Sequence, residues 1–194
     1  EAFIDAIADV LGSTEGGMGQ SVTTKDTPAG ETARFGLSPT TKVLTDDGRE
    51  VTPGSGEIGM VANGGLVPLG YYKDPEKSAR TFREVGGVRY SFPGDMARVA
   101  ADGSLELLGR GSNCINTGGE KVFPEEVEEA LKQHPAVEDA LVFGVPDERF
   151  GNRIVGVVSL APGASATADE VIADTKHRLS SFKVPRSLHV AERV

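Results

Sequence analysis

The chain has 194 residues, of which 38 % are hydrophobic and 25 % charged, as in an ordinary soluble protein of one or two domains. Its 29 acidic and 20 basic residues give a net charge of −9, which repels phosphate backbones and makes nucleic acid a poor candidate partner. A single cysteine excludes an internal disulfide, and no apolar run approaches the roughly 20 residues that span a bilayer. The first residues do not resemble a signal peptide, so we expect a cytoplasmic protein without integral membrane contact, although peripheral association remains open.

The first 19 residues predict a helix followed by a glycine-rich loop. Apolar residues in 1–11 have helical spacing, and Gly12 is typical of a helix end. The loop 12–19 contains four glycines, which let backbone N–H groups approach an anion, together with Thr14 as a hydroxyl donor and Glu15 as a possible magnesium ligand. On composition alone, an ordinary surface turn is the simpler interpretation.

Short strands dominate the chain from there to residue 109. Residues 20–40 are polar and indicate loops or short edge segments. Asp-Gly and Gly-Gly turns then separate apolar runs, which predicts a small, mostly antiparallel barrel or sandwich over about 21–109. Asp74-Pro75-Glu76 begins a short helix within this region. The expected strands are 42–45, 50–51, 56–62, 88–91, 96–100 and 104–108.

The stretch 109–128 indicates a joint between two domains. Its sequence predicts the end of a strand, a polar loop with a Gly-Gly turn, and a helix that begins at Pro124. Two strands follow, then a second helix that begins at the capping box of Thr167, and then a last strand. Residues 110–194 are therefore expected to form a compact α+β domain. The whole chain is therefore expected to be α+β, with a small antiparallel subdomain followed by this second domain.

Two further side chains allow chemical interpretations. Asp95 is expected at the end of a strand, after Pro93-Gly94, where a carboxylate can accept two hydrogen bonds from the vicinal hydroxyls of a ribose. A turn-capping aspartate is the alternative. Cys114 has no neighbour apart from Arg110 that would lower its pKa, which favours a small buried hydrophobe over a reactive thiol.

Three stretches in series, covering nearly the whole chain, resemble adenylate-forming acyl-CoA synthetases. They are Gly12-Ser13-Thr14-Glu15-Gly16-Gly17, Tyr90-Ser91-Phe92-Pro93-Gly94-Asp95, and the hinge-like run from Gly109-Arg110 through Gly119, Lys121, Pro124 and Glu126. The residues around Gly118-Gly119-Glu120-Lys121 are most similar to bacterial fatty-acid and related lipid CoA ligases. The resemblance implies that 1–109 is the distal end of a large N-terminal AMP-binding domain and 110–194 a hinged C-terminal lid.

The resemblance also assigns roles to individual residues. Thr14 contacts the nucleotide phosphate, Glu15 holds magnesium, Asp95 and Arg110 bind the ribose, Ser112 is the hinge, and Gly118 and Gly119 lie beside the pantetheine of coenzyme A. Ser112 departs from the family, which commonly has Asp or Lys at this pivot. The pocket for the acyl group is expected to be bordered, within this chain, only by Gly16, Gly17 and Met18.

The implied reaction has two steps that use ATP, magnesium and coenzyme A. A carboxylic acid, fatty or a related lipid, is activated as acyl-AMP, and the thiol of CoA then displaces AMP. The family's phosphate loop and adenylation lysine have no counterpart in these residues, so the missing N-terminal part is a required partner and the chain alone is expected to be inactive. Two alternatives remain: an acyl-AMP ligase that loads a carrier protein, which CoA dependence would distinguish, and a non-catalytic nucleotide-binding or interaction module, which titration with AMP would test.

Overall fold

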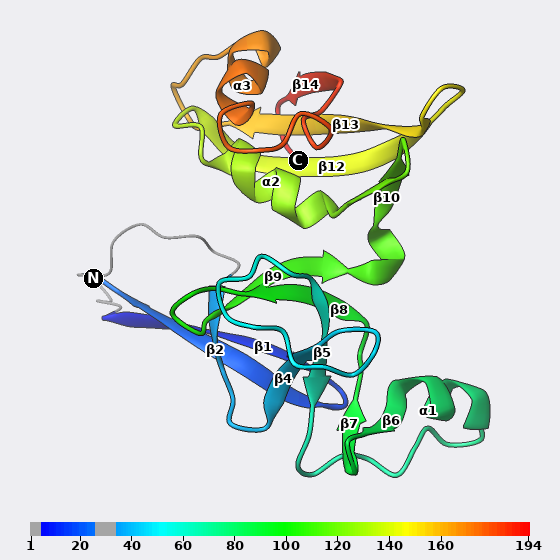
Figure 1. The fold of residues 1–194 in the computed structure, drawn as a ribbon. Coiled ribbons are helices and arrows are strands. Elements are labelled where there is room, and N and C mark those ends of the chain that lie inside the picture. The colour runs from blue at the N-terminus through cyan, green and yellow to red at the C-terminus, as the bar shows by residue number, and fades with distance from the viewer. Residues whose placement is uncertain (1–4, 26–33) are drawn as a thin grey trace. The chain divides into compact units, whose positions relative to one another are not determined.

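A computed structural model describes residues 5–25 and 34–194, and these residues divide into two units at the boundary between Leu108 and Gly109 (Figure 1). The first unit is built on one large sheet with a short helix. The second has a smaller sheet with two helices. The predicted α+β class is therefore confirmed, and each unit is described separately below.

The sheet of the first unit is open. Its strand order is β1-β2-β3-β9-β8-β5-β7-β6, with β4 paired to β5, and the registered pairs are antiparallel. The path runs from β1 to β6 without closing, so the described strands do not form a barrel, and the sandwich alternative stays a prediction. The strands are β1 (Ala6–Ser13), β2 (Gly16–Thr24), β3 (Arg34–Leu37), β4 (Thr41–Leu44), β5 (Gly59–Asn63), β6 (Phe82–Val85), β7 (Val88–Ser91), β8 (Asp95–Val99) and β9 (Leu105–Arg110).

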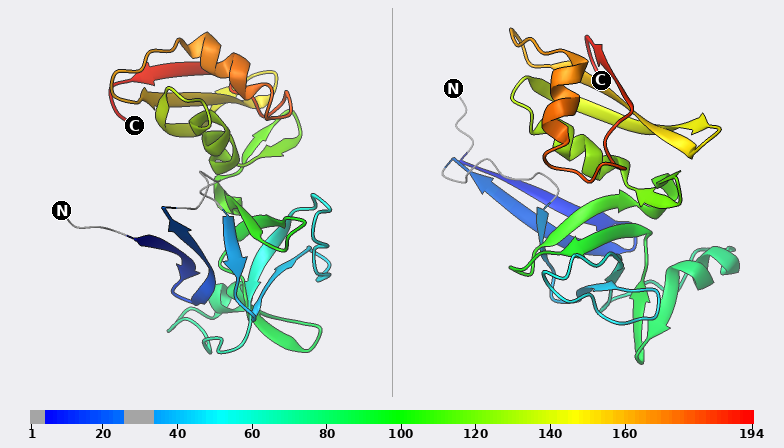
Figure 2. Two further views of the ribbon diagram at one scale, coloured as in Figure 1. Left: turned by 90° about the vertical axis from the view of Figure 1, so that its left-hand side faces the viewer. Right: turned by 45° about the horizontal axis from the view of Figure 1, so that its top comes forward.

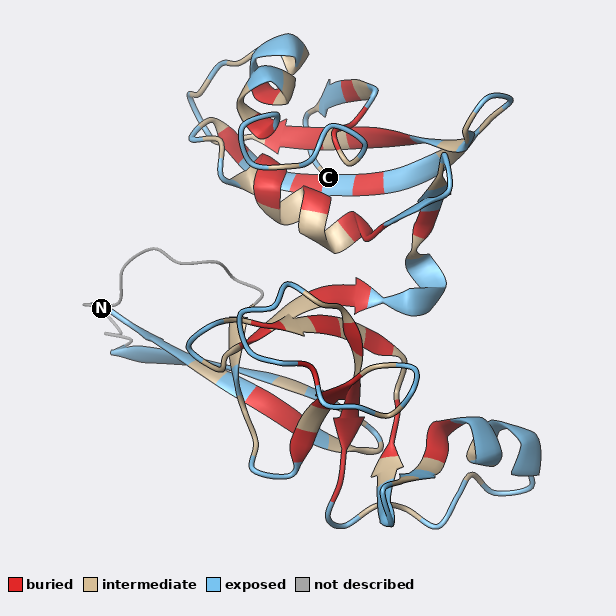
Figure 3. Ribbon diagram, viewed as in Figure 1, coloured by how far each residue is buried: buried red, intermediate tan, exposed pale blue. Residues whose placement is uncertain are grey.

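The helix predicted over residues 1–11 is wrong for the part that the structure describes. Strand β1 pairs with β2 in a register that runs from Ala6 opposite Thr24 to Ser13 opposite Gly16, and both views of Figure 2 show the two strands side by side. Ile7 and Val10 are 55 % and 72 % exposed, so the apolar spacing marks no buried helix face (Figure 3). Both residues are β-branched and suit a strand. Residues 1–4 of the predicted helix, and 26–33 of the predicted loop 20–40, lie outside the described residues; β2 and β3 occupy part of the remainder of that loop.

Local capping chemistry explains the helix of the first unit. Helix α1 (Pro75–Thr81) has Asp74 as its N-cap, whose side chain accepts a hydrogen bond from the backbone N–H of Lys77 at 2.9 Å. Proline at the first helical position and an acid in the first turn complete the predicted start signal.

The second unit combines a mixed sheet with two helices. Strands β12 and β13 are antiparallel, whereas β14 lies parallel to β13, a pairing that the connection through α3 allows. The β10–β11 pair forms a separate small hairpin. The elements are the short 3-10 helix η1 (Gly111–Asn113), β10 (Ile115–Thr117), β11 (Glu120–Val122), α2 (Pro124–Lys132), β12 (Val137–Asp147), β13 (Gly151–Leu160), α3 (Ala168–Thr175) and β14 (Ser187–Ala191).

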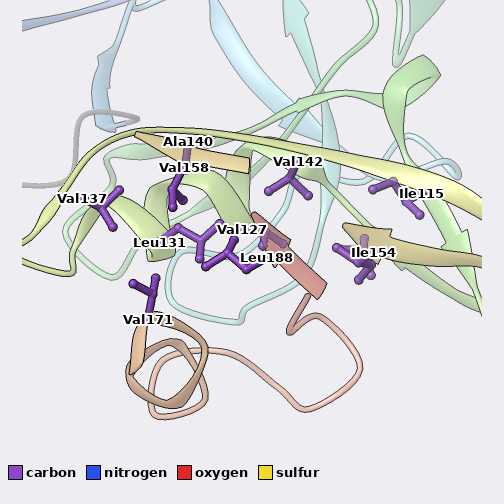
Figure 4. Packing of buried hydrophobic residues seen from close by; sticks show 11 residues of the cluster. Ile115, Val127, Leu131, Val137, Ala140, Val142, Ile154, Val158, Val171 and Leu188 are labelled. Atoms are coloured by element: carbon purple, nitrogen blue, oxygen red, sulfur yellow. The ribbon is translucent and has the colours of Figure 1, made fainter. Parts of the chain in front are cut away.

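A single apolar cluster holds the second unit together (Figure 4). Leu131 from α2, Val171 from α3 and Val158 from β13 are fully buried within it. Gly156 on β13 allows this packing, because a Cβ there would lie 2.6 Å from Cδ1 of Leu188 and 3.5 Å from Cδ1 of Leu131. The sheet and both helices are thus fixed to one another in a unit that can carry a site of its own.

Glu128 on α2 gives this unit a pH-dependent stability. Its Oε1 accepts a hydrogen bond from the Val142 backbone N–H at 2.8 Å, and burial raises the pKa of the carboxyl above the ordinary value of 4.5. Between the pKa of Glu128 in the unfolded state and its higher pKa in the folded state, the folded protein holds a proton that the unfolded protein has lost. The free energy of unfolding therefore falls as pH rises between these two values. Relative to the parent, we expect Glu128→Gln to gain stability between pH 4 and pH 7 in urea unfolding. Glu138→Gln, at an exposed position of the same unit, is the control, and an unchanged difference at the two pH values would contradict the assignment.

Candidate functional site

The predicted phosphate and magnesium residues lie at the tip of the β1–β2 hairpin. Thr14 and Glu15 form the turn, and the Thr14 hydroxyl donates a hydrogen bond to Oε2 of Glu15 at 2.9 Å. The Tyr71 hydroxyl donates to Oε1 of the same carboxylate. The Glu15 backbone N–H donates to Oγ of Ser13 at 3.2 Å. Both carboxylate oxygens are thus oriented by protein donors, within a turn that a strand pair holds.

These hydrogen bonds keep the Glu15 carboxylate charged. Partial burial raises its pKa, but hydrogen bonds from Tyr71, Ser13 and Thr14 together outweigh that effect and lower the pKa to about 2. An anionic carboxylate is the form that a magnesium ion requires.

Gly16 of this loop lies close to a neighbouring strand, whereas Gly17 has open space at its Cβ position. Gly16 has φ of +146°, and a Cβ there would lie only 2.3 Å from Nδ2 of Asn63 on β5. Met18 is 1 % exposed and belongs to the core cluster of the first unit, and its expected place at the border of an acyl pocket stays a prediction.

The hairpin tip fits a metal ion that a substrate helps to bind. Among residues 5–25 and 34–194, no group of three or more His, Cys, Asp or Glu side chains could hold a metal by itself. Magnesium is commonly bound by one or two carboxylates together with substrate phosphates. A carboxylate has about four lone-pair positions, and Thr14 and Tyr71 use two of those on Glu15, so coordination positions remain.

The predicted ribose residues belong to neighbouring strands. Asp95 begins β8 and is 8 % exposed, a burial unusual for an aspartate that only caps a turn. Arg110 ends β9, the neighbour of β8 in the sheet order, and its side chain is exposed.

The predicted hinge residue lies just after β9. Ser112 is exposed within η1, and its hydroxyl donates to Oδ1 of Asn113 at 3.3 Å. Cys114 follows with intermediate exposure, and burial raises the pKa of its thiol, in agreement with an unreactive side chain.

Gly118 and Gly119 form the tight turn between β10 and β11. Their φ angles are +58° and +88°, the pattern of a type I′ hairpin turn in which both central residues need the left-handed region. The Gly118 N–H donates to the Phe150 carbonyl at 2.9 Å. A Cβ on Gly118 would lie 3.4 Å from Cδ1 of Phe150, whereas one on Gly119 would meet nothing within 4 Å. The surroundings of the two glycines therefore differ, because only Gly118 lies against the Phe150 side chain.

Gly118 lines a pocket of about 100 Å³ in the second unit. The lining includes both apolar and polar residues. The guanidinium carbons of Arg186 and Arg149 lie 4.9 Å and 5.0 Å from the centre of the Phe150 ring. The lining residues are Thr117, Gly118, Glu120, Phe150, Ile154, Phe182, Val184 and Arg186.

The sequence analysis did not predict that Phe182, Val184 and Arg186 line this pocket. These residues follow α3, more than sixty positions after Gly118, and the only local signal was a Pro-interrupted segment before the last strand. Parallel pairing of β14 with β13 brings them to the pocket.

An ion pair fixes the segment that supplies these residues. Lys183 contacts both carboxylate oxygens of Glu126 at 2.7 Å, and the two side chains are only 11 % and 15 % exposed. Lys183 stands between Phe182 and Val184, so the pair ties one wall of the pocket to the first turn of α2.

Breaking this pair is expected to destabilise the second unit. Lys183→Met removes the ammonium group that faces the Glu126 carboxylate, at a cost of about 3 kcal/mol for a largely buried charge. The double variant Lys183→Met/Glu126→Leu should recover most of that loss, because both charges are then gone. Urea unfolding measures the effect, with Lys176→Met at an exposed site as control. A single variant as stable as the control would contradict the assignment.

Comparison with known proteins identifies the family. Residues 126–194 match the AMP-binding enzyme C-terminal domain, and the chain belongs to this family of adenylate-forming enzymes, where it corresponds to the C-terminal third of acyl-CoA ligases. It is 52 % identical, over 97 % of its length, to a 3-oxocholest-4-en-26-oate–CoA ligase of Rhodococcus rhodochrous. It is 50 % identical, again over 97 % of its length, to a medium/long-chain-fatty-acid–CoA/3-oxocholest-4-en-26-oate–CoA ligase of Mycolicibacterium smegmatis. The chain spans about one third, 34 %, of each of these relatives.

A solved structure supports the same assignment. ATP-bound MatB from Rhodopseudomonas palustris superposes with a TM-score of 0.76 at 27 % identity, over 97 % of this chain and 37 % of that one. The resemblance stated from three sequence stretches is therefore confirmed.

None of the helices that the structure describes has the length and apolar character needed to cross a bilayer.

Proposed function

We propose that the chain is the C-terminal part of an ATP-dependent acyl-CoA synthetase that activates a fatty acid or a related lipid carboxylate as acyl-AMP and transfers the acyl group to CoA. The observation that carries this proposal is the 52 % identity to a ligase of that kind over 97 % of the chain. The two relatives act on medium- or long-chain fatty acids and on a steroid carboxylate by name, which favours bulky apolar acids as the substrate class.

Most of the groups that we assign to the nucleotide belong to the first unit, and Arg110 belongs to the second. Thr14 is proposed to contact the nucleotide phosphate, and the anionic Glu15 to hold the magnesium ion, which neutralises phosphate charge when bound. Asp95 is proposed to accept hydrogen bonds from the ribose hydroxyls, with Arg110 as its companion.

The second unit supplies a place for the thiol substrate. The pocket of about 100 Å³ is smaller than the several hundred cubic ångströms typical of a whole-ligand site, so it suits a thin segment such as the pantetheine arm. Arg149 and Arg186 flank Phe150 and would meet the phosphates of CoA, a local positive charge in a chain of net charge −9. Ser112, a small exposed residue just after β9, is proposed as the pivot between the two steps.

The test uses the full-length enzyme with a panel of carboxylic acids. We expect ATP–pyrophosphate exchange that depends on the acid, and thioester formation that depends on free CoA. Transfer to a carrier protein instead of CoA would support the acyl-AMP ligase alternative. The 194-residue chain mixed with ATP, acid and CoA is expected to release no pyrophosphate, and AMP binding by the chain without any chemistry in the full-length protein would favour a non-catalytic module.

A further inference from the structure

Two adjacent tyrosines after β5 have opposite environments. Tyr72 is 88 % exposed, whereas Tyr71 is turned into the first unit and its hydroxyl donates a hydrogen bond to Oε1 of Glu15. Tyr71 lies 56 positions after Glu15 in the sequence. The hydrogen bond between them is therefore made by the fold and not by the local sequence.

The rest of Tyr71 is fixed by three contacts. Its ring packs on Phe82 with 5.4 Å between centroids, and the Lys77 ammonium lies 4.0 Å from the ring centre. Its backbone N–H donates to Oγ of Ser78 at 2.8 Å, and Ser78 in turn donates to the Asp74 carbonyl at 2.6 Å. The phenol is therefore anchored to α1 and is not free to follow the carboxylate.

We propose that Tyr71 is a positioning residue that fixes the orientation of the Glu15 carboxylate for the magnesium–nucleotide complex. The phenol holds Oε1 while Thr14 holds Oε2, so the carboxylate plane is set from both sides and its remaining lone pairs face away from these donors. Hydrogen bonds to a ligating carboxylate commonly raise metal affinity or activity by about ten- to a hundredfold. This inference rests on the proposed role of Glu15.

The test compares Tyr71→Phe with Tyr72→Phe in the full-length enzyme. Phenylalanine keeps the packing on Phe82 and removes only the hydroxyl, so the fold should be retained. We expect Tyr71→Phe to weaken the binding of Mn²⁺–ATP, followed by electron paramagnetic resonance of Mn²⁺, about tenfold, and to raise KM for magnesium–ATP more than it lowers kcat. Tyr72→Phe should bind as the parent does.

Glu15→Gln separates this inference from the proposed function. If Tyr71 acts through Glu15, Tyr71→Phe should cause little further loss of Mn²⁺–ATP binding in the Glu15→Gln background. If Tyr71→Phe instead disturbs folding in general, the double variant should bind Mn²⁺–ATP more weakly than Glu15→Gln alone. Parent-like Mn²⁺–ATP affinity of Tyr71→Phe, with weak binding by Glu15→Gln, would overturn the positioning role alone. Parent-like affinity of Glu15→Gln would overturn the proposed role of Glu15 itself.

Discussion

Replacing Asp95 by asparagine in the full-length ligase is expected to lower kcat/KM for ATP about 100-fold. Asparagine keeps the shape of this buried side chain but removes the negative charge that would accept both ribose hydrogen bonds. A hydrogen bond to a charged group contributes roughly 1.5–3 kcal/mol and a neutral one about 1 kcal/mol, so the two bonds together lose about 3 kcal/mol. Acid-dependent ATP–pyrophosphate exchange at varied ATP concentrations measures this loss.

An exposed carboxylate of the same unit provides the control. Asp46→Asn changes the same chemical group in a surface turn, and it should leave the exchange rate as in the parent. Exchange by Asp95→Asn within twofold of that control would show that Asp95 does not bind the nucleotide.

Replacing Gly118 by tryptophan is expected to block thioester formation at least about 100-fold while adenylate formation stays within about twofold. A side chain at this position would project toward Phe150 and fill the pocket that we assign to the pantetheine arm. The acyl-adenylate should therefore accumulate when CoA is added, because the thiol must occupy a defined position to react. Quenched-flow measurement of acyl-AMP and acyl-CoA follows both steps.

Backbone strain at Gly118 needs a matched control. Gly163 also has a left-handed φ, +78°, lies in a loop of the same unit, and has open space around its Cβ position. Gly163→Trp introduces similar strain without entering the pocket and should leave both steps intact. Equal loss of thioester formation in the two variants would attribute the effect to folding.

Elements that depend on local chemistry were predictable from the sequence. The starts of α1, α2 and α3 follow from Asp74-Pro75, Pro124 and the Thr167 capping box, all of which the structure confirms. Gly118 and Gly119 were likewise recognisable as a turn because their positive φ angles require glycine.

Elements that depend on distant pairing were not predictable. Residues 6–13 have a spacing compatible with a helix, and only their pairing with β2 makes them a strand. The contact between Tyr71 and Glu15 spans 56 positions, and the approach of Arg186 to Phe150 depends on β14 adding in parallel to β13. Such neighbours follow from sheet topology, which one sequence does not specify residue by residue.

The most direct test compares the two half-reactions in Asp95→Asn and Gly118→Trp, side by side. Acyl-AMP is formed first from ATP and the acid, and purified acyl-AMP is then offered to each enzyme with CoA. We expect Asp95→Asn to weaken both steps, because ATP and acyl-AMP carry the same ribose, and Gly118→Trp to fail only at the second, because only that step needs the pocket that we assign to the pantetheine arm. Loss of adenylate formation by Gly118→Trp, or parent-like activity of Asp95→Asn in both steps, would contradict these assignments.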